Sequence, residues 1–279
     1  MNSHGGRKYH RRDAEVAEKI VQSIPMWNPG QYLKFDTERT QPCRDLVSRI
    51  MLQDVQRAID LGCGPGNSTQ VLRERWPHAD ITGLDNSNEM LASAREAQPQ
   101  GRWIHGDIAQ WVDQPGEAFD LVFSNAAVHW VSDHAAVFPK LLARTRAALA
   151  VQMPGNLNGP VHRILRETAS TPQWRSLLGD VKNWQAHEPE FYYDVLSPLA
   201  SRVDIWATEY IHIMKSPEAI IEWYKGTGLR PYLDGLKSAA DREKFLGEVL
   251  EKVRGAYPVR KNGQVLFPFR RVFVIAYVG

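Results

Sequence analysis

The chain has 279 residues, of which 43% are hydrophobic and 24% charged, and its formal net charge is +2. These values are typical of a globular protein, and the small net charge excludes a global field that would favour nucleic acid or an anionic membrane. No apolar run approaches the length of a membrane span and none follows the basic start, so we expect neither a membrane protein nor a secreted one. With only two cysteines, Cys43 and Cys63, the expected compartment is the reducing cytoplasm.

The first part of the chain is predicted to lie outside the central fold. Residues 1–25 are expected to form a polar, partly disordered extension that carries a short amphipathic helix over 13–24. Residues 26–56 are expected to form a helical lid, with a helix over 36–51 whose apolar residues recur at helical spacing.

A regular alternation of strands and helices is predicted from residue 57 to residue 154. The expected strands cover 58–61, 81–84, 102–105, 119–124 and 149–153, and the expected helices cover 68–75, 88–97 and 135–149. Such alternation is typical of a parallel sheet with right-handed crossovers. We therefore predict an α/β fold with a doubly wound, mostly parallel, Rossmann-like sheet of seven strands, whose core is residues 57–154.

The pattern changes after this core. Residues 155–200 contain helical pieces and several Pro, Gly and aromatic residues but no obvious strand, and we interpret them as a helical cap or insert. Residues 201–279 are expected to complete the sheet and to carry helices on the substrate side. The predicted elements are strands over 203–214 and 271–278 and helices over 216–224 and 241–256.

The most informative motif is the segment Asp60–Thr69, in which a strand leads through a glycine turn into a helix. Gly62, Gly64 and Gly66 permit a close approach of the backbone to a ligand, and the helix N-terminus offers free N–H groups to a carboxylate. The longer loop of nucleoside triphosphate enzymes, which ends in Lys-Ser or Lys-Thr, is not found here. Asp85 ends the next strand, where a doubly wound fold places a ribose-binding carboxylate. The alternatives are a purely structural turn and a helix-capping or surface acid.

This loop resembles the first signature of class I S-adenosylmethionine-dependent methyltransferases. The resemblance implies that the loop cradles the amino-acid end of S-adenosylmethionine, that Asp85 binds its ribose, and that Asp107 and Ile108 lie beside its adenine. The implied cofactor-binding residues are Asp60, Gly62, Cys63, Gly64, Gly66, Asn67, Asp85, Asn86, Met90, Asp107, Ile108 and Asn125. Asp107 as a loop cap and Asn125 as a turn residue are the alternatives. Nicotinamide enzymes more often carry G-x-G-x-x-G, which this loop lacks because residue 67 is Asn.

Further segments are similar to the trans-aconitate 2-methyltransferases. They include Trp27-Asn28-Pro29, Arg75-Trp76-Pro77, Ala150–Pro154, Tyr192-Tyr193-Asp194, Val203–Trp206 and Thr227–Pro231. The similarity runs from about residue 26 to residue 278 and implies methylation of one carboxylate of trans-aconitate, a small tricarboxylate, to a monomethyl ester. Two features depart from the family pattern: residues 1–25 lie outside it, and the connection that precedes the strand at Ala150 is short.

Methyl transfer to a carboxylate makes simple demands on the site. The nucleophile is ionised at pH 7, so the site must align the reactants and exclude water, but it needs no general base. The negative charges of a tricarboxylate call for cations or N–H donors, and Arg is suited to bidentate binding. The candidate arginines are Arg39, Arg230, Arg270 and Arg271, of which Arg39 and Arg230 are favoured. The further substrate candidates are Tyr32, His129 and Trp130, and for each candidate a packing or surface role is the alternative.

Other chemistries have no comparable pattern in the sequence. The nine histidines show no metal-binding spacing such as H-E-x-x-H, and no G-x-S-x-G motif indicates a hydrolase. We therefore expect no metal, no nucleic-acid or membrane partner, and a monomer. Three alternatives stay open: a methyltransferase for another small carboxylate or a natural-product acceptor, a non-catalytic protein that binds S-adenosylmethionine, and a nicotinamide oxidoreductase.

Overall fold

The computed structural model describes residues 36–181 and 184–279, and side chains from residue 40 onward in the first range. The predicted helix over 13–24 and the candidate residue Tyr32 lie outside the described residues. The chain divides into two compact units. The described part of the larger unit is 36–157, 184–212 and 268–279, and that of the smaller unit is 158–181 and 213–267.

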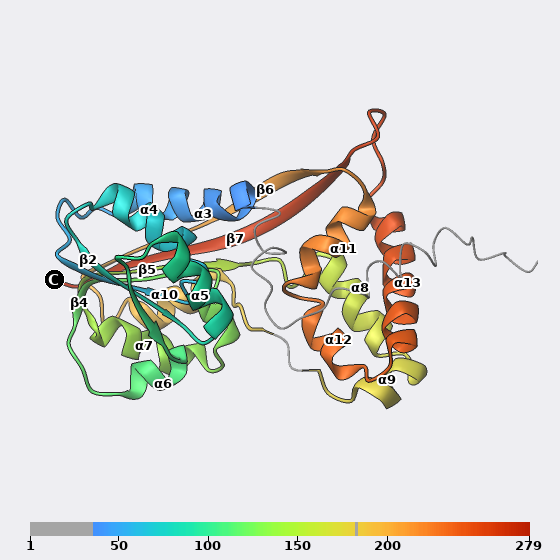
Figure 1. Cartoon of the computed structure of the whole chain (residues 1–279), viewed down its shortest axis with the longest axis horizontal. Coiled ribbons are helices and arrows are strands. Elements are labelled where there is room, and N and C mark those ends of the chain that lie inside the picture. The colour runs from blue at the N-terminus through green and yellow to red at the C-terminus, as the bar shows by residue number, and fades with distance from the viewer. Residues whose placement is uncertain (1–35, 182–183) are drawn as a thin grey trace, which may run out of the picture. The chain divides into compact units, whose positions relative to one another are not determined.

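The larger unit is built on a seven-stranded sheet with the strand order β3-β2-β1-β4-β5-β7-β6 (Figure 1). The strands are β1 (Arg57–Leu61), β2 (Asp80–Asp85), β3 (Arg102–His105), β4 (Phe119–Asn125), β5 (Thr145–Pro154), β6 (Arg202–Met214) and β7 (Val265–Tyr277). The pairs β1–β2, β2–β3, β1–β4 and β4–β5 are parallel, and β7 pairs antiparallel with β5. The predicted α/β class with a mostly parallel, doubly wound sheet is confirmed.

The order of the central strands indicates where a ligand can bind. Leu121, Val122 and Phe123 of β4 are fully buried, as expected for a parallel strand covered on both faces. The strand order reverses between β1 and β4, and open α/β sheets form their binding crevice at the carboxyl ends of the strands at such a point. The glycine loop after β1 and Asn125 at the end of β4 therefore lie at the same edge.

Two apolar layers hold helices against the two faces of this sheet. One layer includes Leu46, Phe123 and Ile275 and packs under α3 (Asp36–Arg49) and α4 (Asn67–Arg75). The other layer packs under α6 (Ile108–Asp113), α7 (His134–Ala143) and α10 (Pro189–Leu196). Figure 1 shows α3 and α4 on one side of the strands and α6 and α7 on the other. A further helix, α5 (Asn88–Ala97), contacts β2 and β3.

The helix predicted over 135–149 is wrong in its second half. α7 ends at Ala143, and β5 already begins at Thr145. Ala and Leu, which dominate this segment, have high helix propensity, but the segment lies between β4 and β7, where the sheet determines its conformation. The Arg144 N–H and the Thr145 hydroxyl both donate to the Leu141 carbonyl, at 3.1 and 2.9 Å, and close the helix. The early start of β5 accounts for the short connection before Ala150.

The smaller unit is mainly helical in its described part. It contains α8 (Pro160–Ala169), α9 (Pro172–Leu178), α11 (Pro217–Lys225), α12 (Arg230–Gly235) and α13 (Ala239–Ala256), together with the ends of β6 and β7. The Trp174 ring meets Phe245 of α13 edge-on, with centroids 5.2 Å apart, and its indole N–H donates to Glu248 at 2.7 Å. The predictions of helices over 216–224 and 241–256 are confirmed. The short helices α6 and α12 were not predicted, and the five-part division of the chain stays a prediction.

Candidate functional site

The glycine loop after β1 adopts backbone conformations that residues other than glycine reach only with strain. Gly62, Gly64 and Gly66 have φ angles of +73°, +54° and +94°. A Cβ atom at Gly62 would lie 2.1 Å from the Ala127 Cβ, so the loop can approach the end of β4 only with glycine here. The N–H groups of Gly62 and Cys63 both donate to the Leu84 carbonyl, at 2.7 and 3.0 Å, which ties the loop to β2.

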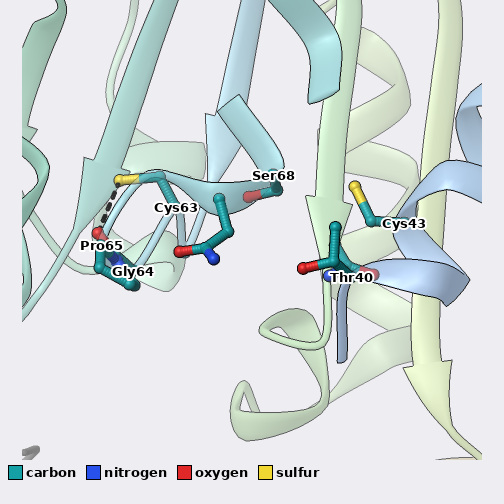
Figure 2. Close-up of a pocket in the computed structure, with 9 residues that line it drawn as sticks. Thr40, Cys43, Cys63, Gly64, Pro65 and Ser68 are labelled. Atoms are coloured by element: carbon teal, nitrogen blue, oxygen red, sulfur yellow. Dashed lines mark hydrogen bonds between the residues drawn. The ribbon is translucent and has the colours of Figure 1, made fainter. Parts of the chain in front are cut away.

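This loop forms one wall of a pocket that lies within the larger unit. Figure 2 shows Cys63, Gly64 and Pro65 on one side and Thr40 and Cys43 of α3 on the other. The space is partly open to solvent, and its empty volume of about 340 Å³ includes part of that solvent. The lining residues are Thr40, Cys43, Gly62, Cys63, Gly64, Pro65, Asn67, Ser68 and Asn125. Of the predicted loop residues, Gly62, Cys63, Gly64 and Asn67 are thus brought together with Asn125, whereas Gly66 is not among the lining residues. The residues Thr40, Cys43, Pro65 and Ser68 were not predicted.

Asp60 lies beneath the loop and is fully buried. Its Oδ2 accepts hydrogen bonds from the hydroxyl groups of Ser68 and Thr69, at 2.7 and 2.6 Å, which anchors the first turn of α4 to β1. Its Oδ1 has no hydrogen-bond partner among the described residues. Burial raises the pKa of Asp60 to about 6, although the two hydroxyl bonds favour the charged form. Asp60 therefore positions the loop from below.

Asp85 connects the end of β2 to the loop. Its Oδ2 accepts from the Gly64 N–H and its Oδ1 from the Ser87 N–H, both at 2.9 Å. Burial raises the pKa of Asp85, and these backbone bonds act in the opposite direction. Each carboxylate oxygen keeps a second lone pair, and the residue is partly exposed, so the carboxylate can still accept from a ligand hydroxyl.

The remaining residues expected on the nucleoside side are distributed between surface and core. Asp107 caps α6, because its Oδ1 accepts from the N–H groups of Ala109 and Gln110 at 2.9 and 3.2 Å. Ile108 and Met90 are buried, and the Ile108 Cδ1 atom lies 3.7 Å from the position that a Gly62 Cβ would take. Asn86 is exposed. The capping role of Asp107 is therefore observed, and its place beside adenine stays a prediction.

The segment after β4 brings polar groups to the pocket edge. Asn125 lines the pocket, and its Oδ1 has no hydrogen-bond partner among the described residues. Its Cα partner on β5 is Gln152, which is fully buried and whose Nε2 is likewise without a partner in the described part of the chain. Gln152 was not predicted, because it lies in an apolar strand segment where one amide carries no distinctive signal.

His129 and Trp130 follow this segment in a short 3₁₀ turn over Val128–Trp130. The His129 ring is 4% exposed and meets the Trp184 ring edge-on at 5.1 Å, whereas Trp130 is 39% exposed. His129 is thus packed between aromatic groups, and the substrate-binding roles of both residues stay predictions.

The candidate arginines occupy different environments. Arg39 lies in α3, and its side chain is outside the described part. Arg230 begins α12 in the smaller unit, and its Nε lies 3.3 Å from Asp234. Arg270 pairs with Glu188 at 2.8 Å, whereas Arg271 is 3% exposed and lies 3.5 Å from the Gln152 Oε1.

Two other kinds of site have no counterpart in the described residues. Among residues 36–181 and 184–279, no group of three or more His, Cys, Asp or Glu side chains is placed to hold a metal ion. No helix in that part of the chain is long and apolar enough to span a membrane.

The pocket fits S-adenosylmethionine on three observations. First, the loop backbone lies so close to the segment after β4 that a Cβ at Gly62 would collide with Ala127. Second, the Asp85 carboxylate lies at the end of β2, beside the loop. Third, the buried Oδ1 of Asn125 has no hydrogen-bond partner among the described residues. A backbone cradle, a ribose acceptor and an acceptor for an ammonium group are the features that this ligand requires.

Comparison with known proteins agrees with this geometry. Residues 58–150 match the family model described as a methyltransferase domain. The chain resembles in fold the YcgJ protein from Bacillus subtilis, at 13% identity and a TM-score of 0.57 over 85% of this chain and 98% of that one. A putative methyltransferase from Bacillus halodurans is similar at 12% identity and a TM-score of 0.53, over the same shares of the two chains.

Sequence relatives are much closer. Trans-aconitate 2-methyltransferase from Paracidovorax citrulli is 44% identical over 90% of this chain and 97% of its own length. The proteins of that name from an Azoarcus species and from Klebsiella pneumoniae are also 44% identical, over 91% and 90% of this chain and 99% and 97% of their own lengths. The chain therefore belongs to the trans-aconitate 2-methyltransferase family of S-adenosylmethionine-dependent enzymes.

Proposed function

We propose that this protein transfers a methyl group from S-adenosylmethionine to one carboxylate of trans-aconitate and releases the monomethyl ester. The observation that carries this proposal is the 44% identity to trans-aconitate 2-methyltransferases over nine-tenths of the chain. The pocket beside the glycine loop supports it, because the loop and Asn125 at the end of β4 line this pocket and Asp85 accepts a hydrogen bond from the Gly64 N–H.

The chemistry requires little from titrating side chains. A carboxylate oxygen forms the new bond to the methyl carbon as the carbon–sulfur bond breaks, and the bonding electron pair stays on sulfur. The electrophilic methyl group is what the cofactor supplies when it is bound. The nucleophile is already ionised near pH 7, so the protein binds, aligns and desolvates the reactants. His129 is accordingly assigned no role as a base, in keeping with its packing against Trp184.

We assign the cofactor to the loop edge of the larger unit. Gly62, Cys63, Gly64, Gly66 and Asn67 would hold the amino-acid end, with Asn125 as an acceptor for its ammonium group. The nucleoside would lie along Asp85, Asn86, Met90, Asp107 and Ile108. Asp60 acts through the loop and is a positioning residue, because it is fully buried below the loop.

Substrate binding is assigned to cationic and polar side chains. Arg39 and Arg230 would neutralise the substrate carboxylates. The side chains of Tyr32, His129 and Trp130 would contact the substrate, and residues 26–56 would act as a lid. The same proposal includes a monomer in the cytoplasm, where the two buried cysteine thiols stay reduced. Light scattering of the purified protein tests the monomer.

The test is methyl transfer from labelled S-adenosylmethionine to trans-aconitate, cis-aconitate, citrate and itaconate. Saturable labelling of trans-aconitate with a clear preference over the other acids is the expected result. Labelling of a different acid would replace the substrate and keep the reaction. Cofactor binding without labelling of any acid would overturn the proposed function in favour of another acceptor or of a non-catalytic binding protein.

A further inference from the structure

A row of polar side chains crosses the face of the sheet that α3 covers. Phe123 of β4, Ala150 of β5 and Phe273 of β7 belong to the apolar layer under α3. Side chains alternate along a strand, so residues two positions away share that face. These residues are Asn125, Gln152 and Arg271, and His212 lies on the same face of β6, two residues beyond Tyr210. We call Asn125, Gln152, His212 and Arg271 the polar band.

The polar band begins at the cofactor pocket. Asn125 lines that pocket and is paired in register with Gln152 on β5. The Arg271 Nη1 lies 3.5 Å from the Gln152 Oε1. Because β4 and β5 are parallel and β7 is antiparallel to β5, the carboxyl ends of β4 and β5 and the amino-terminal half of β7 meet at one edge. The band therefore continues directly from the pocket that Asn125 lines.

The burial of the polar band is unusual for its chemistry. Gln152 is fully buried, and Arg271 and His212 are 3% and 7% exposed. Buried polar groups are costly unless they are hydrogen-bonded, and charged ones more so. The Phe269 ring lies 4.6 Å from the Arg271 guanidinium carbon. The Gln152 Nε2 has no partner among the described residues, so an N–H donor stands beside a buried cation.

The members of the polar band themselves carry a single positive charge. On α3, the Asp45 carboxylate accepts from the Tyr210 hydroxyl at 2.5 Å and from the Gln41 amide at 2.8 Å, so each of its oxygens is directed at one of these donors. Burial and the nearby Arg271 lower the pKa of His212 to about 4, which leaves its ring neutral near pH 7. The band thus combines one guanidinium with neutral hydrogen-bonding groups.

We propose that the polar band is a subsite for a carboxylate of the substrate that is not methylated, held by the Arg271 guanidinium and the Gln152 Nε2. This inference rests on the proposed function, and it names residues that determine the preference for a polycarboxylate. A carboxylate accepts two hydrogen bonds in one plane, which suits a guanidinium with an amide donor at its side. Asn125 marks the border with the cofactor.

The experiment compares Arg271→Gln and Gln152→Met with Arg270→Gln. Arg270 is the matched control, because it is the adjacent arginine on β7, lies on the opposite face of the strand and pairs with Glu188. For each variant, kcat and KM for trans-aconitate are measured, together with calorimetric affinity for S-adenosylhomocysteine.

We expect Arg271→Gln to raise KM about 100-fold and Gln152→Met about tenfold, because a charge-assisted pair and a single neutral donor are lost. Affinity for S-adenosylhomocysteine should stay within about twofold in both, and Arg270→Gln should match the wild type. Should Arg271→Gln not fold, Arg271→Lys takes its place with an expected tenfold rise, because Lys keeps the charge but loses the planar fork.

Unchanged KM in variants that still bind S-adenosylhomocysteine would overturn the subsite. Failure of the proposed function looks different, because the wild type itself would then not methylate trans-aconitate. In that case the thermal shift of the S-adenosylhomocysteine complex on addition of trans-aconitate or citrate tests the subsite alone. Stabilisation of the wild type that Arg271→Gln abolishes supports it, and equal shifts in both overturn it.

Discussion

The glycine loop and the polar band lie at the same edge of one sheet but are built in different ways. The loop is a continuous segment, Gly62–Gly66, held by backbone hydrogen bonds to Leu84 and by positive φ angles. The polar band takes single side chains from β4, β5, β6 and β7 and buries those from β5, β6 and β7. Binding by backbone suits a ligand part common to a whole enzyme class, whereas binding by side chains can be changed to select one acceptor.

The largest effect is expected from a substitution in the glycine loop. Gly62→Ala places a Cβ 2.1 Å from the Ala127 Cβ at a φ of +73°, so the loop must move. We expect about 3 kcal/mol of lost stability and at least about 100-fold weaker cofactor binding. Gly64→Ala is the matched variant, because its φ is +54° but nothing lies within 4 Å, and it should cost only about 1 kcal/mol. Urea unfolding and calorimetry check both, and equal losses of stability in the two variants would contradict the steric account.

The second prediction concerns acid stability of the polar band. Burial and Arg271 lower the pKa of His212 to about 4. Between that value and the ordinary value near 6.5, the unfolded chain binds a proton that the folded protein does not, so stability is lost as the pH falls. Relative to His212→Gln, the wild type should lose about 3 kcal/mol between pH 6.5 and pH 4. Urea unfolding of both proteins over this pH range measures the loss. If the wild type and His212→Gln lost the same unfolding free energy, the lowered pKa of His212 in the folded protein would be refuted.

Asp60 beneath the loop should show the opposite dependence. Burial raises its pKa to about 6, so the folded protein keeps a proton that the unfolded chain loses above pH 4. Stability is therefore lost as the pH rises from 4 to about 6. Relative to Asp60→Asn, the wild type should lose about 2 to 3 kcal/mol over that interval. The same urea series measures it, and a constant difference between wild type and variant would mean that the carboxylate is charged throughout.

Asp85 is expected to affect the cofactor more than the fold. Asp85→Asn removes the charge and directs an amide N–H at one of the backbone donors, Gly64 or Ser87. We expect cofactor affinity to fall about tenfold to 30-fold, through the lost ribose acceptor and the distorted loop. Glu89→Gln, which removes an exposed charge at the start of α5, is the control and should leave the affinity unchanged. Equal affinities for Asp85→Asn and the wild type in calorimetry would remove Asp85 from the site.

The smallest effect separates a surface ion pair from a substrate contact. Arg230→Gln breaks the contact with Asp234, and such a pair contributes under about 1 kcal/mol to stability. If Arg230 binds substrate, KM for trans-aconitate should rise about tenfold without a change in cofactor affinity. Asp234→Asn breaks the same contact but keeps the cation, so its KM should stay at the wild-type value. Wild-type kinetics in both variants would leave Arg230 without a role in substrate binding.

Prediction succeeded where the signal was local. Strands β1 to β4, the helices α4 and α5 and the loop follow from apolar spacing and glycines within about ten residues. It failed at 144–149, where Ala-rich helix propensity was overridden by a central place in the sheet. It also missed Gln152 and the lining residues Thr40 and Cys43, because a single residue in a helix or strand does not reveal which others it faces.

By itself, the sequence determined the fold class, the glycine loop and the position of Asp85 at the end of β2, because these depend on spacings within short segments. The family resemblance likewise named the reaction class that the relatives support. Only the tertiary structure decided that Asn125, Gln152 and Arg271 lie next to one another. Strand pairing brings together residues that are far apart in the sequence, such as Gln152 and Arg271, which are 119 positions apart. Burial, which makes the Arg271 cation and the Asp60 acid consequential, is likewise a property of the packed sheet.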